Sequence, residues 1–217
     1  MIGLLVAAAL VGAPTQCAAN ASSEAALVET KRLPSHDSEP RPRTLIATTY
    51  KIPGLGPNDI ADTRLIIQSE RCETLFEQEF EGTQDIKLAL VQLAKTPFLV
   101  VTVFNAGGSG CGIDHMLISY DGTPRAWAPA ALGHDNMGSL FVGDLGQGRG
   151  PGLVLLEAQW GSGSHYDPHP YRVSTYRWKD EYFIGPETKT TKPMSPDPEK
   201  VAKSLGLPSA AEFSFPC

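Results

Sequence analysis

Short apolar runs, separated by glycine, proline and small polar residues, recur along most of this chain. At 153–156 four apolar residues follow one another, directly after Gly152 and four residues before the Gly/Ser segment 161–164. Runs of this length in a glycine-rich setting are typical of buried strands rather than of helices. Further strands are predicted at 45–50 and 64–68. At 86–90 the apolar residues alternate in a way that fits a strand or a helix, and the internal repeat described below favours a strand.

One short helix is predicted near the C-terminus. Asp197 is a typical N-cap, Pro198 suits the first helical position, and Glu199 places an acidic group in the first turn. Gly206 ends this helix after about two turns. The rest of the chain is rich in turn residues, so the sequence predicts an all-β, mainly antiparallel fold with a short C-terminal helix.

The segment 144–155 joins a glycine-rich turn to a buried strand, and it resembles the loop and strand of FG-GAP/VCBS-type β-propeller repeats. In that family the acidic side chains of the loop bind calcium, which takes about six to eight oxygen ligands. Here Asp144 is the one acid that matches, while Gly146, Gly148 and Gly152 stand where the family has Asn, Asp and Asp or Glu. The resemblance implies a turn that keeps its shape without the metal, and an ordinary glycine-rich hairpin would show the same pattern.

An internal repeat supports this resemblance. Each unit contains a turn, a buried strand, a Gly/Ser loop, and a strand that ends in an aromatic and an acidic turn. The aligned segments are 97–101 with 151–155, 107–110 with 161–164, and 119–122 with 176–180. Two such units cannot close a ring, because propellers need about four blades or more. The repeat therefore predicts a partial or degenerate arrangement of propeller-like sheets, or a β-sandwich.

Residues 1–21 have the outline of a signal peptide. An apolar run at 2–11 is followed by small residues at 19 and 21, as at a signal-peptidase site, although no Lys or Arg precedes the run. A lipoprotein alternative would place a lipid on Cys17, which Gln16 before it fits poorly. We therefore expect a periplasmic or secreted protein with no transmembrane segment in the mature chain.

Two further regions follow the signal peptide. Residues 22–43 are rich in Ser, Pro and charge, which predicts a disordered tether. Residues 44–217 are predicted to form a single β-rich domain. The formal net charge of −6 argues against nucleic acid or an anionic membrane as partner. The expected partner is a protein or glycan ligand in the envelope.

The cysteines predict one disulfide. After removal of residues 1–21, three remain, and export places them in an oxidising compartment. We expect Cys72 to pair with Cys111, since both fall near strand ends of the β domain. The alternative joins Cys217 to one of them.

The loop 161–170 is the most distinctive polar segment. His165, Asp167 and His169 alternate, so an extended backbone would direct all three to one side, where they suit zinc or another transition metal. A solvated surface loop is the alternative, and no other cofactor is predicted. Two more His/Asp pairs are expected on the same rim of the fold. Asp114 and His115 are placed there by the repeat alignment, and His134 and Asp135 by their position just before the second unit.

No complete catalytic constellation is present. The serines of the glycine loops lack the strand–turn–helix elbow of a nucleophile, and a Cys111 nucleophile with His115 as base would require a reduced thiol. This absence favours an exported, non-catalytic binding or envelope-interaction module on a propeller-like β scaffold, with an unidentified ligand. The alternative is a secreted metal-dependent enzyme that uses His165, Asp167 and His169.

Overall fold

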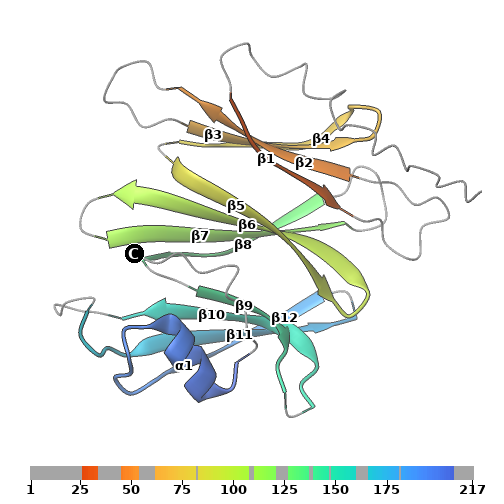
Figure 1. Cartoon of the computed structure of the whole chain (residues 1–217). Coiled ribbons are helices and arrows are strands. Elements are labelled where there is room, and N and C mark those ends of the chain that lie inside the picture. Colours follow the sequence, from red (N-terminus) through yellow and green to blue (C-terminus); the bar gives the residue numbers. More distant parts are fainter. Residues whose placement is uncertain are drawn as a thin grey trace, which may run out of the picture.

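The fold consists of three antiparallel sheets that stack face to face (Figure 1). In this computed structural model, twelve strands and one helix occur in the part of the chain that is described. The described residues are 26–33, 45–53, 62–81, 83–107, 110–120, 127–136, 139–146, 148–159, 166–180 and 182–207.

Each sheet is a four-stranded meander, in which neighbouring strands follow one another in the chain. The first sheet contains β1 (Ala26–Leu33), β2 (Leu45–Ile52), β3 (Asp62–Ser69) and β4 (Thr74–Phe80). The second contains β5 (Thr83–Leu93), β6 (Thr96–Gly107), β7 (Gly110–Tyr120) and β8 (Trp127–Asn136). The third contains β9 (Ser139–Asp144), β10 (Pro151–Ala158), β11 (Tyr171–Lys179) and β12 (Tyr182–Thr190).

This arrangement confirms the predicted all-β, mainly antiparallel fold. A four-stranded meander is also the unit of a propeller blade, and three such units are fewer than a closed ring requires. The description as partial propeller-like sheets or as a sandwich therefore applies. The segments 97–101 and 151–155, which the sequence aligns, lie in β6 and β10, the second strands of their sheets.

Strand β6 lies in the middle layer and is apolar on both faces. Phe98 and Val100 belong to the apolar core shared with the third sheet, whereas Leu99 and Val101 belong to the core shared with the first. All four side chains are buried. Because neighbouring residues of a strand face opposite sides, a middle strand needs the continuous apolar run that the sequence shows.

The predicted helix is confirmed as α1 (Pro198–Leu205). The carboxylate of Asp197 accepts hydrogen bonds from the backbone N–H groups of Glu199 and Lys200, at 3.0 and 3.4 Å. Gly206 ends the helix in the left-handed conformation, with φ 64°. Val201 and Ala202 are buried in the core of the third sheet, which α1 covers on its outer side (Figure 1).

Part of the predicted tether is structured. Residues 26–33, inside the segment 22–43, form β1, which pairs with β2 from Ala26 to Leu33. The carboxylate of Glu29 also accepts a hydrogen bond from the backbone N–H of Leu88, at 3.2 Å. Polar bonds rather than a long apolar run thus hold this strand, and for that reason composition alone missed it. Residues 1–21 lie outside the described part.

The stacked sheets have two ends, which we name by their connections. At the β10–β11 end, β6 passes into β7, β8 into β9 and β10 into β11. At the β9–β10 end lie the connections from β5 to β6, from β9 to β10 and from β11 to β12. In Figure 1 the arrowheads of β6 and β10 mark the β10–β11 end on the left.

Candidate functional site

On the second sheet, the face toward the third sheet becomes polar near the β10–β11 end. Along β6, Val100 is followed two positions later by Thr102, and His115 of β7 is the residue paired with Thr102. Both side chains are buried. Nδ1 of His115 and Oγ1 of Thr102 are hydrogen-bonded at 3.2 Å. The imidazole is therefore fixed within the sheet rather than directed to solvent.

The third sheet shows the same change on the opposing face. Along β10, Leu155 is followed by Glu157, which pairs in register with Arg172 of β11. This face is turned toward the second sheet, because Trp178 on it contacts Phe98 of β6, with ring centroids 4.9 Å apart. Glu157 and Arg172 therefore belong to the layer between the two sheets. We call Thr102, His115, Glu157, Arg172 and Ser174 the polar layer.

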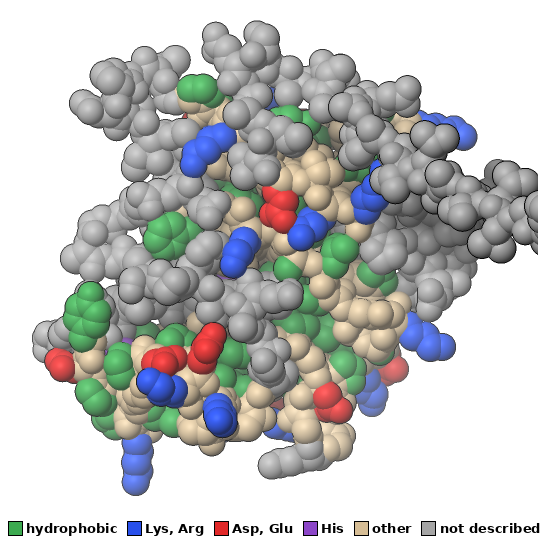
Figure 2. Space-filling model, in the orientation of Figure 1, with side chains coloured by type: hydrophobic (Ala, Val, Ile, Leu, Met, Phe, Trp, Pro, Cys, Tyr) green, Lys and Arg blue, Asp and Glu red, His purple; other side chains and the backbone are tan. Residues whose placement is uncertain are grey.

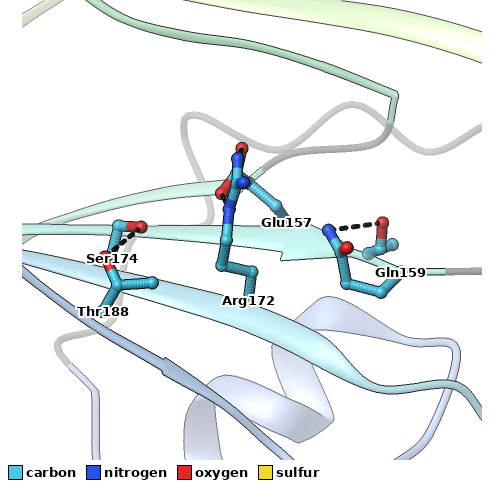
Figure 3. Close-up of polar contacts among 6 residues, drawn as sticks. Glu157, Gln159, Arg172, Ser174 and Thr188 are labelled. Carbon is cyan, nitrogen blue, oxygen red and sulfur yellow. Dashed lines mark hydrogen bonds and ion pairs between the residues drawn. The ribbon is translucent and has the colours of Figure 1, made fainter.

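Glu157 and Arg172 form a two-pronged ion pair. Nε and Nη2 of Arg172 each donate to one carboxylate oxygen of Glu157. The Glu157 side chain is 4% exposed, but that of Arg172 is 50% exposed. Figure 3 shows the pair projecting from the sheet on the side away from α1. The carboxylate thus lies in the interior and holds a guanidinium that reaches the surface.

The rest of this region makes local hydrogen bonds. The hydroxyls of Ser174 and Thr188 lie 3.3 Å apart on neighbouring strands (Figure 3). The side-chain amide of Gln159 donates to the carbonyl of Ala158 at 3.4 Å. Both bonds are local, and they lie beside the ion pair on the same sheet (Figure 3).

An ion pair is not the usual way to fill the interior between two sheets. Moving a carboxylate into the interior costs several kcal/mol, and an apolar pair of similar size is often as stable as a buried ion pair. Leu153 and Leu155 already fill the preceding inward positions of β10. A charged residue at the next such position breaks the apolar pattern, and such breaks are expected where function rather than folding selects the residue.

Sequence reasoning did not single out Glu157 or Arg172. The available signal was an acidic residue in phase with the apolar positions of a buried strand. Its partner depends on the β10–β11 register, which a single sequence does not reveal.

The predicted metal ligands are only partly described. His165 lies outside the described residues, and the side chain of Asp167 is exposed. His169 is buried, with Nδ1 2.8 Å from the backbone oxygen of Asp167 and its ring 4.7 Å from that of Tyr171. No group of three or more His, Cys, Asp or Glu side chains is placed to hold a metal within the described ranges. The metal site remains a prediction, and the contacts of His169 tie its loop to the sheet.

The other predicted pairs lie at the same end of the fold. Asp114 and His115 are near the start of β7, and Asp114 pairs in register with His134 near the end of β8. Two residues separate the end of β8 from the start of β9. The first residue of β9, Ser139, pairs in register with Leu156 near the end of β10. The strand directions therefore place these backbone positions at the β10–β11 end, where the loop with His169 also begins.

Tyr171, beside this loop, is a fixed hydrogen-bond donor. Its hydroxyl donates to the backbone oxygen of Ser195 at 2.9 Å. Burial, and secondly the negative charge of Asp197, raise the pKa of Tyr171 to about 12. The hydroxyl thus keeps its proton at neutral pH and cannot serve there as a base.

The loop after Asp144 is closed by internal bonds. The Asp144 carboxylate accepts from the N–H of Gly146 at 2.8 Å, and the Leu145 N–H donates to the Gly150 carbonyl at 2.9 Å. Nη2 of Arg149 donates to the Leu145 carbonyl at 2.6 Å, and its Nε to that of Gly146 at 3.4 Å. A guanidinium thus binds the carbonyl oxygens of this turn. Sequence reasoning found the turn but missed Arg149.

The two cysteines of the predicted disulfide lie in different regions. Cys72 is in the turn between β3 and β4, and β4 then runs the length of its sheet to Phe80. β5 begins at Thr83, at the end of the sheet that lies away from Cys72, and its first residue pairs with Asn105 near the end of β6. Cys111, near the start of β7, pairs with Ala106 of β6 at the same end. Figure 1 shows the β3–β4 turn on the right and the start of β7 on the left. The side chain of Cys111 is not described, so the pairing stays a prediction.

Comparison of the chain with protein-family models, with curated proteins and with solved structures found no match. Among the described residues, no helix has the length and apolar character needed to cross a membrane.

Proposed function

We propose that the protein is an exported, non-catalytic binding module that takes a protein or glycan ligand at the β10–β11 end. The observation that carries this proposal is the polar layer between the second and third sheets, above all the buried Glu157 carboxylate that holds Arg172. The three-sheet scaffold supports it, because loops at one end of stacked sheets are common ligand sites.

The polar groups at this end suit recognition better than chemistry. The imidazole of His115 is bonded to Thr102, and that of His169 to a backbone carbonyl. Groups engaged in this way hold surfaces in shape, whereas a catalytic base must reach a substrate proton. The alternative of a metal-dependent enzyme gains no support from these contacts.

Two side chains at this end have the properties of binding residues. Arg172 presents a guanidinium whose orientation Glu157 fixes, and Tyr166 is 74% exposed. Arginine and tyrosine are enriched among the residues that dominate binding energy at interfaces. Tyrosine offers a large, rigid contact surface at a low cost in conformational entropy, and arginine offers five N–H donors. We expect both to contact the ligand.

A matched pair of tyrosine variants tests the location of the site. Tyr182 is 73% exposed at the start of β12, at the β9–β10 end. Wild type, Tyr166→Ala and Tyr182→Ala are immobilised and exposed to envelope extract and to a glycan array. Ligands held by the wild type should be lost from Tyr166→Ala and kept by Tyr182→Ala. Equal loss from both variants, or loss from Tyr182→Ala alone, would contradict the proposed site.

Export is tested separately. N-terminal sequencing of the protein from the envelope fraction should show a chain that begins just after Ala21. An intact Met1 on protein confined to the cytosol would refute the predicted compartment.

A further inference from the structure

The cation that the β10–β11 end presents is already neutralised by its own sheet. Each carboxylate oxygen of Glu157 accepts from one nitrogen of Arg172. The Glu157 side chain is 4% exposed, so a ligand cannot reach this carboxylate, whereas half of the Arg172 side chain is exposed. An anionic ligand group would compete with Glu157 for the guanidinium, and a cationic one would be repelled by it. Charge complementarity at this pair therefore favours an uncharged ligand.

Uncharged polar side chains surround the ion pair on the same face of the third sheet. Thr190 of β12 pairs in register with Arg172, and Thr188 lies two positions before it on the same face. Gln159 lies two positions after Glu157, and Figure 3 shows its side chain beside the ion pair. All three side chains are exposed. Hydroxyl and amide groups both donate and accept hydrogen bonds, so they match a ligand that is rich in hydroxyl groups.

The nearby segments add no net charge. Asp167 is an exposed acid in the β10–β11 loop, and Lys192 is an exposed base just after β12. The segment with Lys192 is held at this end, because the N–H of Thr191 donates to the carbonyl of Tyr171 at 2.9 Å. These two charges have opposite signs. The net charge of −6 of the whole chain repels anions over a longer range (Figure 2 shows charges of both signs scattered over one face).

One exposed aromatic ring completes the surface. Large apolar side chains are exposed at four of the described positions, Leu90, Tyr166, Tyr182 and Ile184, and Tyr166 is the one in the β10–β11 loop. A protein interface usually has an apolar centre built from several side chains, which this end does not offer among the described residues. A sugar ring needs less, because its C–H face packs on a single aromatic ring while its hydroxyl groups bind polar neighbours.

We infer that the ligand of the β10–β11 end is a neutral glycan. A sugar ring packs on Tyr166, and its hydroxyl groups bind Gln159, Thr190 and the surface that Arg172 presents. The ion pair with Glu157 selects against acidic sugars. This inference rests on the proposed function, and it decides between the two ligand classes that the proposal allows.

The test uses a surface that carries immobilised hexasaccharides. The neutral members are chains of glucose, mannose, galactose or N-acetylglucosamine, and the acidic members carry uronic acid or sulfate groups. The whole folded protein is applied, and the affinity for each retained sugar is then measured by calorimetry. The site variant is Gln159→Ala. Its matched control is Gln92→Ala, an exposed glutamine of β5 near the β9–β10 end.

We expect wild type and Gln92→Ala to bind a neutral hexasaccharide alike, and Gln159→Ala to bind it about three- to tenfold more weakly, as loss of one hydrogen bond predicts. The acidic members should bind poorly. A third variant, Glu157→Gln, should shift the preference at least about tenfold toward the acidic members, because Arg172 then lacks its counter-charge. Circular dichroism verifies that each variant is folded. If Glu157→Gln does not fold, the two glutamine variants decide the test.

Four results would overturn the inference. Preference of wild type for acidic hexasaccharides would show that Glu157 does not neutralise the site. Equal loss in Gln92→Ala would show unspecific adsorption. No binding of any hexasaccharide at about 1 mM would exclude useful affinity. A ligand from envelope extract that protease destroys, and that Tyr166→Ala fails to hold, would identify a protein ligand and leave the proposed function intact. Capture that does not depend on Tyr166 would instead refute the proposed function itself.

Discussion

Replacement of Arg149 by alanine should destabilise the protein although this residue lies in an exposed loop. Its guanidinium binds the carbonyl oxygens of Leu145 and Gly146, in the turn that resembles a calcium-binding loop. Arg149→Ala removes the cation and leaves both carbonyls to water. The closed shape of the turn then depends on its glycines and on the Asp144 carboxylate alone.

The magnitude follows from the two hydrogen bonds. A hydrogen bond to a charged group contributes about 1.5–3 kcal/mol when well shielded. Here the bond to Leu145 is short and partly buried, at 2.6 Å, while the bond to Gly146 is long and exposed, at 3.4 Å. Solvent screening reduces the total to about 1–2 kcal/mol. For a domain of this size that free energy corresponds to a fall of about 2–8 °C in melting temperature.

Thermal melting followed by circular dichroism checks this value. Arg71→Ala, at an exposed position in the β3–β4 turn, controls for loss of an arginine and should melt like the wild type. Calcium and chelator should leave the wild-type melting temperature unchanged, because the loop offers few anionic ligands and its carbonyls already bind Arg149. The reasoning is refuted if Arg149→Ala melts like the wild type, or if calcium raises the wild-type melting temperature.

Three further predictions concern the rest of the molecule. Gly152→Ala would place a Cβ 2.3 Å from the carbonyl oxygen of Tyr176, so chemical denaturation should show a loss of about 1–3 kcal/mol, and an unchanged midpoint would contradict this packing. The raised pKa of Tyr171, about 12 against 10.0, contributes stability that is complete below pH 10 and is lost as the pH rises toward 12. Wild type should therefore lose melting temperature more steeply than Tyr171→Phe in that range, and parallel curves would refute it. Mass mapping of non-reduced peptides tests the predicted Cys72–Cys111 bond: a peptide that joins these two cysteines is expected, and a Cys111–Cys217 peptide or a free Cys111 would contradict the prediction.

Local patterns were enough to predict several elements. The repeat alignment predicts a buried strand at 97–101, and β6 is an inner strand of the middle sheet with apolar side chains buried on both faces. The caps Asp197 and Gly206 predict both ends of α1. In each case the physical cause acts within a few neighbouring residues, so it is visible in one sequence.

Features that depend on distant residues were missed. The strand β1 forms because β2 pairs with it and because Glu29 reaches Leu88, which is 59 positions away. The ion pair of Glu157 with Arg172 exists only once β10 and β11 adopt their register. Polar composition alone suggested disorder in the first case and gave no warning in the second.

The position of α1 explains how the stack of three sheets ends on one side. A sheet in the middle of a stack is covered on both faces, as the second sheet is, but a terminal sheet has an outer face with no neighbouring sheet. On the third sheet α1 covers the face turned away from the second sheet, and Val201 and Ala202 are buried there. The helix thus takes the place that a further sheet would occupy. Glu157 and Arg172 of the polar layer lie on the other face of the third sheet, the one turned toward the second sheet. One face of the third sheet therefore packs against α1, and the opposite face presents Arg172 near the β10–β11 end.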